Sequence, residues 1–259
     1  MKNILVFAVA ALIAAGCAHT STPKNYSQSA RENYELGEAE YKKKNWLDAI
    51  DYFNEVRNKF PYALEYVVKS ELRLADAYFE DEKYSEASES YRLFVKLHPT
   101  NEKVAYAMFR IGMCSFKQMP KDWFFMPPTY EEDQTKVVAS VEAMSDMVVR
   151  FPDAPEAKEA RVVIDKCRLK LAKHELYVAE FYFREEKWKA TQARAEGLLR
   201  SYSGLGLDDK TWLLLVKSLV KQGLREAAEE ESARFTAKHP GSKEAAEAAL
   251  LVGKMRKNK

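Results

Sequence analysis

The stretch Ala172–Tyr202, AKHELYVAEFYFREEKWKATQARAEGLLRSY, sets a pattern that recurs along the chain. In its first half, Leu176, Ala179 and Phe183 recur at helical spacing, so they share one side of a helix. Three charged residues then interrupt the apolar rows, and Trp188 starts them again. Neither short helix could bury its apolar side alone. The stretch therefore predicts a helical hairpin that belongs to a row of similar hairpins.

The same pattern returns in the N-terminal half of the chain at a shift of 38 residues. Small residues in the first helix, Gly37 and then Ala75, would let paired helices approach closely. Aromatic residues after the turn, Trp46 and then Tyr84, would fill the space between them. Second helices end at prolines, which lack the N–H that a helix needs. These prolines are Pro61, Pro99, Pro152 and Pro240.

This spacing is close to that of tetratricopeptide repeats. The sequence therefore predicts an all-α fold, a tetratricopeptide-like helical-hairpin solenoid of about five repeats with a C-terminal capping helix. Residues 30–152 would form repeats 1–3, with a loop insertion at 118–134. Residues 153–259 would form repeats 4–5 and the capping helix.

The helices of the second group have recognisable starts. Asp153 and Pro155 predict the beginning of a long helix that runs to about Phe183, with a break near Leu171 as an open alternative. Ser242 is predicted to cap the closing helix.

The N-terminus predicts a lipoprotein. An apolar run of 12 residues, Ile4–Ala15, suits a secretory signal and is shorter than the ~20 residues that cross a bilayer. Small residues precede Cys17, so residues 1–16 would be the signal peptide and Cys17 the acylated N-terminus. The alternative is an ordinary signal peptide with Cys17 as a chance thiol. Residues 17–29 would be a flexible tether. In lipoproteins of this type, aspartate after the acylated cysteine usually accompanies retention at the inner membrane. Residue 18 is alanine, which favours the periplasmic face of the outer membrane.

Composition excludes several classes of function. The net charge of +2 among 31% charged residues argues against a nucleic-acid partner. Apart from Cys17, the cysteines are Cys114 and Cys167, which lie in apolar helical patterns. We expect buried thiols there, with a disulfide as the alternative that sequence cannot decide.

The loop insertion, residues 118–134, reads QMPKDWFFMPPTYEEDQ. Its three prolines exclude a helix, yet it is rich in apolar side chains. The candidates for docking are Trp123, Phe124, Phe125 and Tyr130. The loop would either fold back over the edge of the repeats or bind a partner, as long loops in compact folds often do.

No constellation for catalysis, for a cofactor or for a metal is visible. The chain lacks a Gly-rich phosphate loop, a His-Glu-x-x-His motif and cysteines at zinc spacing. His174 beside Glu175 could transfer protons, but on a helical repeat packing or a surface hydrogen bond is the simpler interpretation. We expect no enzyme, no cofactor and no bound metal.

Taken together, the motif at Cys17, the five units and the phrase HELYVAEFYFREEKW at His174–Trp188 resemble the BamD family. A second phrase at Asn58–Pro99 supports the resemblance. These lipoproteins belong to the BAM complex, which assembles β-barrel outer-membrane proteins. The resemblance implies docking on the periplasmic POTRA domains of BamA and recognition of the C-terminal segments of unfolded outer-membrane proteins. It also implies a role for Arg194, which matches a family arginine linked to communication with BamA.

The chain departs from the family pattern in the loop 118–134 and at Ser203. The accessory BAM lipoproteins of some bacteria are therefore open as partners. The alternative function is another periplasmic tetratricopeptide lipoprotein, a pilotin or a cell-envelope coordinator. Coordinators often carry an N-terminal coiled coil, and no heptads precede Ala30.

Solenoid grooves bind extended peptides through many small contacts. An aromatic-lined groove would suit substrate C-termini that are rich in aromatic residues. Tyr62, Tyr66 and Tyr78 are the candidates for the first such groove, with a place in the core as the alternative.

Overall fold

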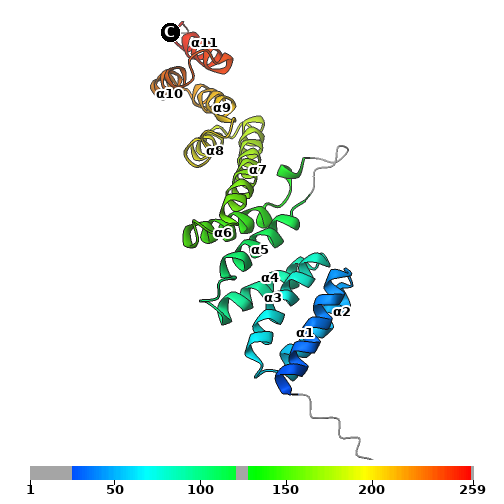
Figure 1. The fold of residues 1–259 in the computed structure, drawn as a ribbon. Coiled ribbons are helices and arrows are strands. Elements are labelled where there is room, and N and C mark those ends of the chain that lie inside the picture. The colour runs from blue at the N-terminus through cyan, green and yellow to red at the C-terminus, as the bar shows by residue number, and fades with distance from the viewer. Residues whose placement is uncertain (1–24, 121–127, 258–259) are drawn as a thin grey trace, which may run out of the picture. The chain divides into compact units, whose positions relative to one another are not determined.

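The computed structural model describes residues 25–120 and 128–257. Within these residues all regular elements are helical, eleven α-helices and the short 3-10 helix η1 (Figure 1). The predicted all-α fold of helical hairpins is therefore confirmed. The elements are α1 (Tyr26–Lys42), α2 (Trp46–Lys59), α3 (Leu64–Glu80), α4 (Tyr84–Leu97), α5 (Val104–Lys117), η1 (Thr129–Glu131), α6 (Thr135–Arg150), α7 (Ala157–Arg184), α8 (Trp188–Ser201), α9 (Asp208–Lys221), α10 (Arg225–Lys238) and α11 (Lys243–Lys257).

One turn geometry recurs in four hairpins. A residue with positive φ ends the first helix of each; these are Lys44 (65°), Glu82 (59°), Glu186 (57°) and Gly223 (76°). The following N–H then bonds to the carbonyl five residues earlier, as from Asn45 to Glu40 at 3.0 Å. This bond satisfies a carbonyl that the helix end would leave without a partner.

Aromatic residues close three of these turns, as the sequence predicts. A ring in the last turn of the first helix meets the first ring of the second helix edge-on. The pairs are Tyr41–Trp46, Phe79–Tyr84 and Phe183–Trp188, with centroids 5.0, 5.2 and 4.9 Å apart. Edge-to-face contacts at this distance are favourable, so the rings fix the angle at which each hairpin folds back.

The chain divides into two compact units, Met1–Ala77 and Tyr78–Lys259. In the first unit, Phe53 of α2 is fully buried and lies against Gly37 of α1. A Cβ at Gly37 would lie 2.6 Å from Cε1 of that ring, so this position must be glycine for the helices to approach as they do. The predicted role of the small residue at Gly37 is confirmed.

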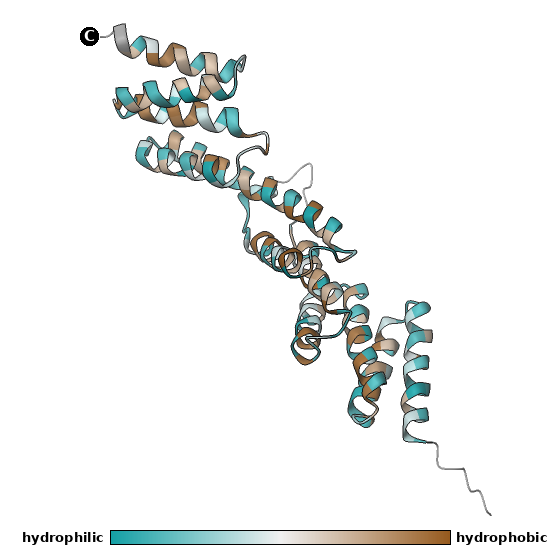
Figure 2. Ribbon diagram, turned by 60° about the vertical axis from the view of Figure 1, so that its left-hand side comes forward, coloured by the Kyte–Doolittle hydropathy of each residue, from teal (hydrophilic) through white to brown (hydrophobic). Residues whose placement is uncertain are grey.

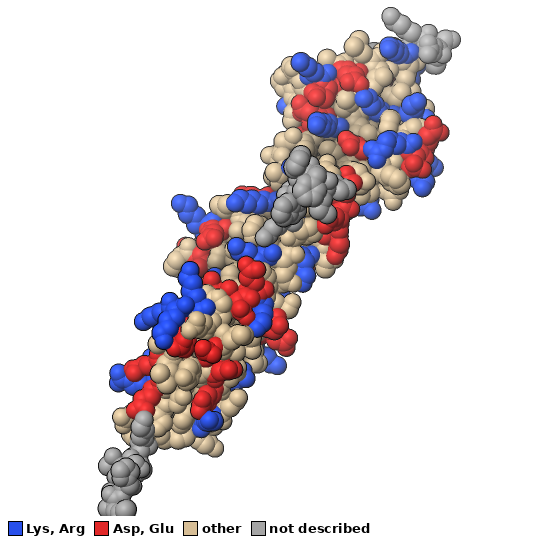
Figure 3. All heavy atoms as spheres, turned by 90° about the vertical axis from the view of Figure 1, so that its right-hand side faces the viewer, with Lys and Arg blue, Asp and Glu red and all other residues tan. Residues whose placement is uncertain are grey.

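In the second unit each helix packs on its neighbours in sequence from α4 to α11. Helices α5, α6 and α7 share a core around Met144, Met147 and Cys167. Helices α9, α10 and α11 share another, in which Trp212 stacks on Phe235 at 5.4 Å. Apolar residues form stripes along the helices (Figure 2), while acidic and basic side chains are interspersed on the face in Figure 3.

The capping helix α11 begins at Lys243, directly after the predicted cap Ser242. Its buried residues Ala245, Ala248 and Val252 belong to the core that it shares with α9 and α10. Ser242 Oγ accepts a hydrogen bond from the N–H of Ala245 at 3.3 Å, which confirms the predicted cap.

The division into units differs from the predicted boundary between residues 152 and 153. Ala157 and Ala160 of α7 lie in the same core as Val104 of α5 and Val137 of α6. The helix after residue 153 therefore continues the third repeat instead of opening a separate group.

Two predicted helix boundaries are also wrong. Helix α1 begins at Tyr26 because the side chain of Asn25 accepts a hydrogen bond from Ser27 N, so the predicted tether 17–29 extends too far. Helix α7 begins at Ala157, because the residues after Phe151 form turns. It then runs for 28 residues without the break considered near Leu171, which packs against the core of α5, α6 and α7.

Cys114 and Cys167 are both buried and unpaired, as expected of core thiols. Burial raises the pKa of the Cys114 thiol to about 12, so it stays protonated at neutral pH. Cys17 lies outside the described residues. Among the described helices, none combines the length and the apolar character needed to cross a membrane.

Candidate functional site

The long helix α7 anchors both ends of the loop insertion. Lys170 Nζ donates to the carbonyl of Pro120 at 3.1 Å, and His174 Nδ1 lies 2.6 Å from the carbonyl of Tyr130. Because a carbonyl only accepts, Nδ1 of His174 carries the proton. The ring of Tyr130 also packs against Tyr177 at 6.0 Å. The surface hydrogen bond expected of His174 therefore holds the Tyr130 end of the loop against α7.

The second end of the loop is a compact turn. The buried Gln134 donates through Nε2 to the carbonyls of Thr129 and Glu132 at 2.9 and 2.7 Å. Asp133 accepts from the hydroxyl and the N–H of Thr135, which lowers the pKa of its carboxyl. This turn fixes Tyr130 against α7.

The predicted docking residues Trp123, Phe124 and Phe125 lie outside the described residues, so their role stays a prediction. Tyr130 is half-buried against α7. The described ends of the loop thus lie on the repeats. Whether the segment between them folds back over the repeats or binds a partner stays open.

Arg194 lies on α8, where its Nη1 contacts Glu175 Oε2 of α7 at 2.8 Å. Its side chain is 46% exposed, so the pair holds the guanidinium at the surface. Glu175 follows directly after His174. Adjacent residues of α7 therefore hold the loop and Arg194, which the sequence did not indicate.

The three candidate tyrosines occupy different environments. Tyr62 is 87% exposed in the turn before α3, where its N–H bonds to Tyr26 Oη. Tyr66, in the first turn of α3, packs its ring 6.0 Å from that of Tyr34. Tyr78 is half-buried near the end of the same helix. Tyr62 is thus a free surface side chain and Tyr66 part of the packing, and a shared groove stays a prediction.

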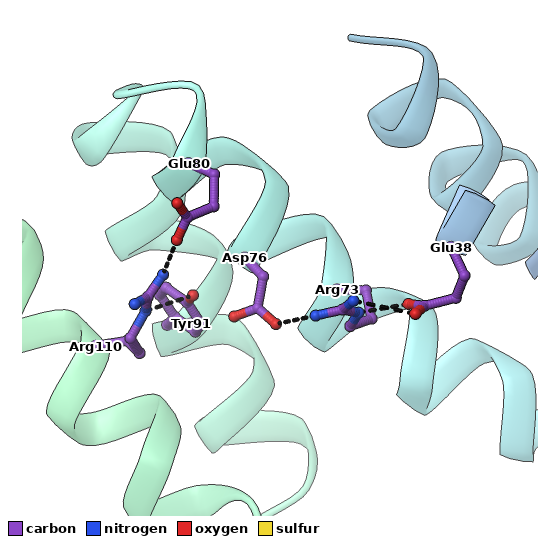
Figure 4. Close-up of polar contacts among 6 residues, drawn as sticks. All are labelled: Glu38, Arg73, Asp76, Glu80, Tyr91 and Arg110. Atoms are coloured by element: carbon purple, nitrogen blue, oxygen red, sulfur yellow. Dashed lines mark hydrogen bonds and ion pairs between the residues drawn. The ribbon is translucent and has the colours of Figure 1, made fainter. Parts of the chain in front are cut away.

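A polar network in the first unit was not predicted. Arg73 of α3 pairs with Glu38 of α1 and with Asp76, whose Oδ2 lies 3.1 Å from Nη1 (Figure 4). The guanidinium lies 4.0 Å above the ring of Tyr41. Although burial alone would lower the pKa of Arg73, these ion pairs raise it. The pKa of the neighbouring Tyr34 is raised to about 12. Burial is the main cause, and the charge of Glu38 is the second.

A related network lies in the second unit. Arg110 of α5 donates to Tyr91 Oη at 3.1 Å and to Glu80 at 3.0 Å (Figure 4). Its guanidinium lies 3.6 Å above the ring of Phe79. Only 16% of its side chain is exposed. The arginine therefore covers Phe79, the first ring of the aromatic pair in the preceding hairpin turn.

The two arginines hold equivalent positions. Arg73 lies two residues before the small residue Ala75, and Arg110 two residues before Gly112. Val216 of α9 is equivalent to Ala75, because each lies seven residues before the residue with positive φ in its turn, Gly223 or Glu82. The same offset from Val216 leads to Leu214, which belongs to the apolar cluster that Phe183 joins. The arginine position of the early repeats thus becomes apolar in the last one. This offset was visible in the sequence, but apolar spacing alone did not single it out.

A comparison with protein families matches residues 26–232 to the model of YfiO, an outer membrane lipoprotein. The chain belongs to the YfiO family. The matched region contains the loop ends, Arg194 and both polar networks. In this YfiO family member, no group of three or more metal-ligating side chains occurs among the described residues.

Curated relatives share the name "Outer membrane protein assembly factor BamD". The protein of Caulobacter vibrioides is 26% identical over 210 residues, which cover 81% of this chain and 66% of that protein. The protein of Rickettsia prowazekii is 23% identical over 242 residues, which cover 93% of both. The resemblance to the BamD family is therefore confirmed.

Among solved structures, a chain of the "TPR2AB-domain:pHSP90-complex of yeast Sti1" is similar in fold, and the alignment covers 86% of this chain and 84% of that chain. The TM-score is 0.42 and the sequence identity 15%. The fold assignment rests on the helices and turns described above.

Proposed function

We propose that this protein is a lipid-anchored scaffold on the periplasmic face of the outer membrane. It would assist the assembly and insertion of β-barrel outer-membrane proteins as a member of the BAM complex. The match of residues 26–232 to an outer membrane lipoprotein family carries this proposal. The names of relatives from Caulobacter, Rickettsia and Vibrio cholerae support the assembly role.

In this proposal the protein acts by binding and not by covalent chemistry. Arg194 would contact the POTRA domains of BamA, since its charge is about half exposed and is oriented by Glu175. The exposed Tyr62 would contribute to the recognition of unfolded outer-membrane proteins, whose C-terminal segments carry aromatic side chains.

Purification of a tagged chain from solubilised outer membranes tests the proposed role. We expect BamA among the co-purified proteins, and a marked loss of BamA from the Arg194→Glu variant because the charge is reversed at the contact. Arg200→Glu, an exposed change on the same helix α8, is the matched control and should retain BamA. Absence of any barrel-assembly subunit from the wild-type sample would contradict the proposal. Such a result would favour a pilotin or an envelope coordinator.

The anchor is tested by cell fractionation. Cys17→Ala removes the only sulfur that the signal motif offers for acylation, and acyl chains contribute ~0.8 kcal/mol per buried CH₂. The variant should move from the membrane fraction to the soluble periplasm. Cys114→Ala, a change in the core, should leave the distribution as it is in the wild type. Retention of the Cys17→Ala protein in the membrane would refute lipid anchoring at this residue.

A further inference from the structure

A hollow of about 810 Å³ opens in the second unit between two successive hairpin turns, α7–α8 and α9–α10. We name it the Trp188 hollow. Its apolar lining is Trp188, Ala190 and Leu224, and its polar lining is Glu186, Lys187, Lys189 and Gln222. Leu224 is 45% exposed, so the hollow presents apolar surface to solvent.

The walls of the Trp188 hollow are held by contacts on both turns. Phe183 meets the Trp188 ring edge-on at 4.9 Å, and Lys221 Nζ lies 5.6 Å from its centroid. Gln222 Nε2 donates to Gln192 Oε1 at 3.0 Å, which ties the second turn to α8. A site formed in advance in this way loses little conformational entropy when it binds a ligand.

The charge around the hollow is unbalanced. Lys187, Lys189 and Lys221 have no carboxylate within ion-pair distance in the described part of the chain, and Glu186 is the only acidic residue of the lining. Turns elsewhere differ in this respect. Lys43 pairs with Glu40, and Lys83 with Asp81, both at 2.7 Å. The uncompensated lysines favour an acidic ligand.

We propose that the Trp188 hollow binds an acidic segment of a partner protein, which inserts one aromatic or aliphatic side chain between Trp188 and Leu224. The carboxylates of the segment would pair with Lys187, Lys189 and Lys221. A concave site with a half-buried tryptophan suits an inserted side chain better than the flat surface of a bilayer.

The hollow is separate from the contact proposed for Arg194. Arg194 lies six positions after Trp188, which places the two side chains about 120° apart around α8. Arg194 faces Glu175 of α7, whereas Trp188 faces the turn before α10. The inference therefore goes beyond the proposed docking of BamA, and a purified chain with a peptide tests it alone.

The probe is the fluorescein-labelled peptide Glu-Asp-Phe-Glu-Asp, followed by fluorescence anisotropy with the full folded chain. We expect saturable binding that weakens as salt is added, because exposed ion pairs are screened. Replacing Phe by Ala in the peptide should weaken binding about tenfold, since the apolar contact with Trp188 and Leu224 is lost. Lys187→Glu/Lys189→Glu should weaken it by about tenfold or more, because two attractive pairs become repulsive.

The matched control is Lys158→Glu/Lys166→Glu, which makes the same change in net charge at exposed positions of α7. It should alter binding by about twofold or less, because charges beyond a Debye length are screened. Equal losses in the two double variants would overturn the proposal, as would absence of peptide binding to the wild type. Binding of phosphatidylglycerol vesicles through Lys187 and Lys189, without binding of the peptide, would also overturn it and would assign a lipid surface instead.

Discussion

Phe53→Ala should destabilise the protein by about 3–5 kcal/mol, the largest loss that we expect from a single substitution. Phe53 is fully buried in α2, where it fills the space left by Gly37 and packs 5.8 Å from the ring of Tyr34. Its removal leaves a cavity between two helices that a rigid backbone cannot close. Urea unfolding followed by circular dichroism measures the change in the free energy of unfolding.

The control lies on the same helix. Leu47 is 61% exposed, so Leu47→Ala should change the free energy of unfolding by only about 0.5 kcal/mol. A second variant separates cavity formation from the close approach of the helices. Gly37→Ala should destabilise the wild type but should be tolerated beside Phe53→Leu, where the ring that a Cβ would meet is gone. A loss below about 1 kcal/mol for Phe53→Ala would contradict the assigned core.

The hairpins were predictable because their signals are local. Gly37 and Trp46 lie nine residues apart, and the same spacing separates Ala75 from Tyr84 and Ala179 from Trp188. The aromatic contact Phe183–Trp188 spans five residues, so spacing alone indicated it. The same reasoning located the loop 118–134, since prolines interrupt a helix wherever they lie.

The remaining features depend on partners that are distant in sequence. The bond between His174 and Tyr130 joins residues 44 positions apart, so no local pattern reveals it. The continuity of α7 near Leu171 follows from its packing against a core that α5 and α6 help to build. Arg73 was overlooked for a related reason: a charged residue on a helix is usually solvated, and only packing shows that it covers Tyr41.

The arginine positions also distinguish the early repeats from the late ones. Arg73 and Arg110 each cover an aromatic ring of the preceding hairpin, within their own unit, and each carries carboxylate partners. In α9 the equivalent Leu214 is buried in an apolar cluster. An apolar side chain can thus take the place of the arginine. Among these three equivalent positions, the charged side chain occurs in α3 and α5, and the apolar one occurs in α9.

This view predicts a difference between two substitutions of Arg110. Arg110→Ala should destabilise the protein by about 2 kcal/mol, because it exposes the Phe79 ring and removes a cation–π contact and the hydrogen bond to Tyr91. Arg110→Leu should cost about half as much or less, since leucine keeps an apolar side chain at the position, as Leu214 does in the last repeat. Glu80 is 40% exposed, so water can solvate its carboxylate once the arginine is gone.

Urea unfolding at neutral pH compares the two Arg110 variants with Arg92→Ala, an exposed arginine on α4 that serves as the control for loss of a positive charge. The control should lie within about 0.5 kcal/mol of the wild type. If Arg110→Leu costs as much as Arg110→Ala, the charge and its hydrogen bonds hold this hairpin in place, and packing over the ring contributes little. If Arg110→Leu is the milder change, packing over the Phe79 ring is the main contribution of the side chain at this position, and an apolar side chain can supply it because leucine also shields an aromatic face from water.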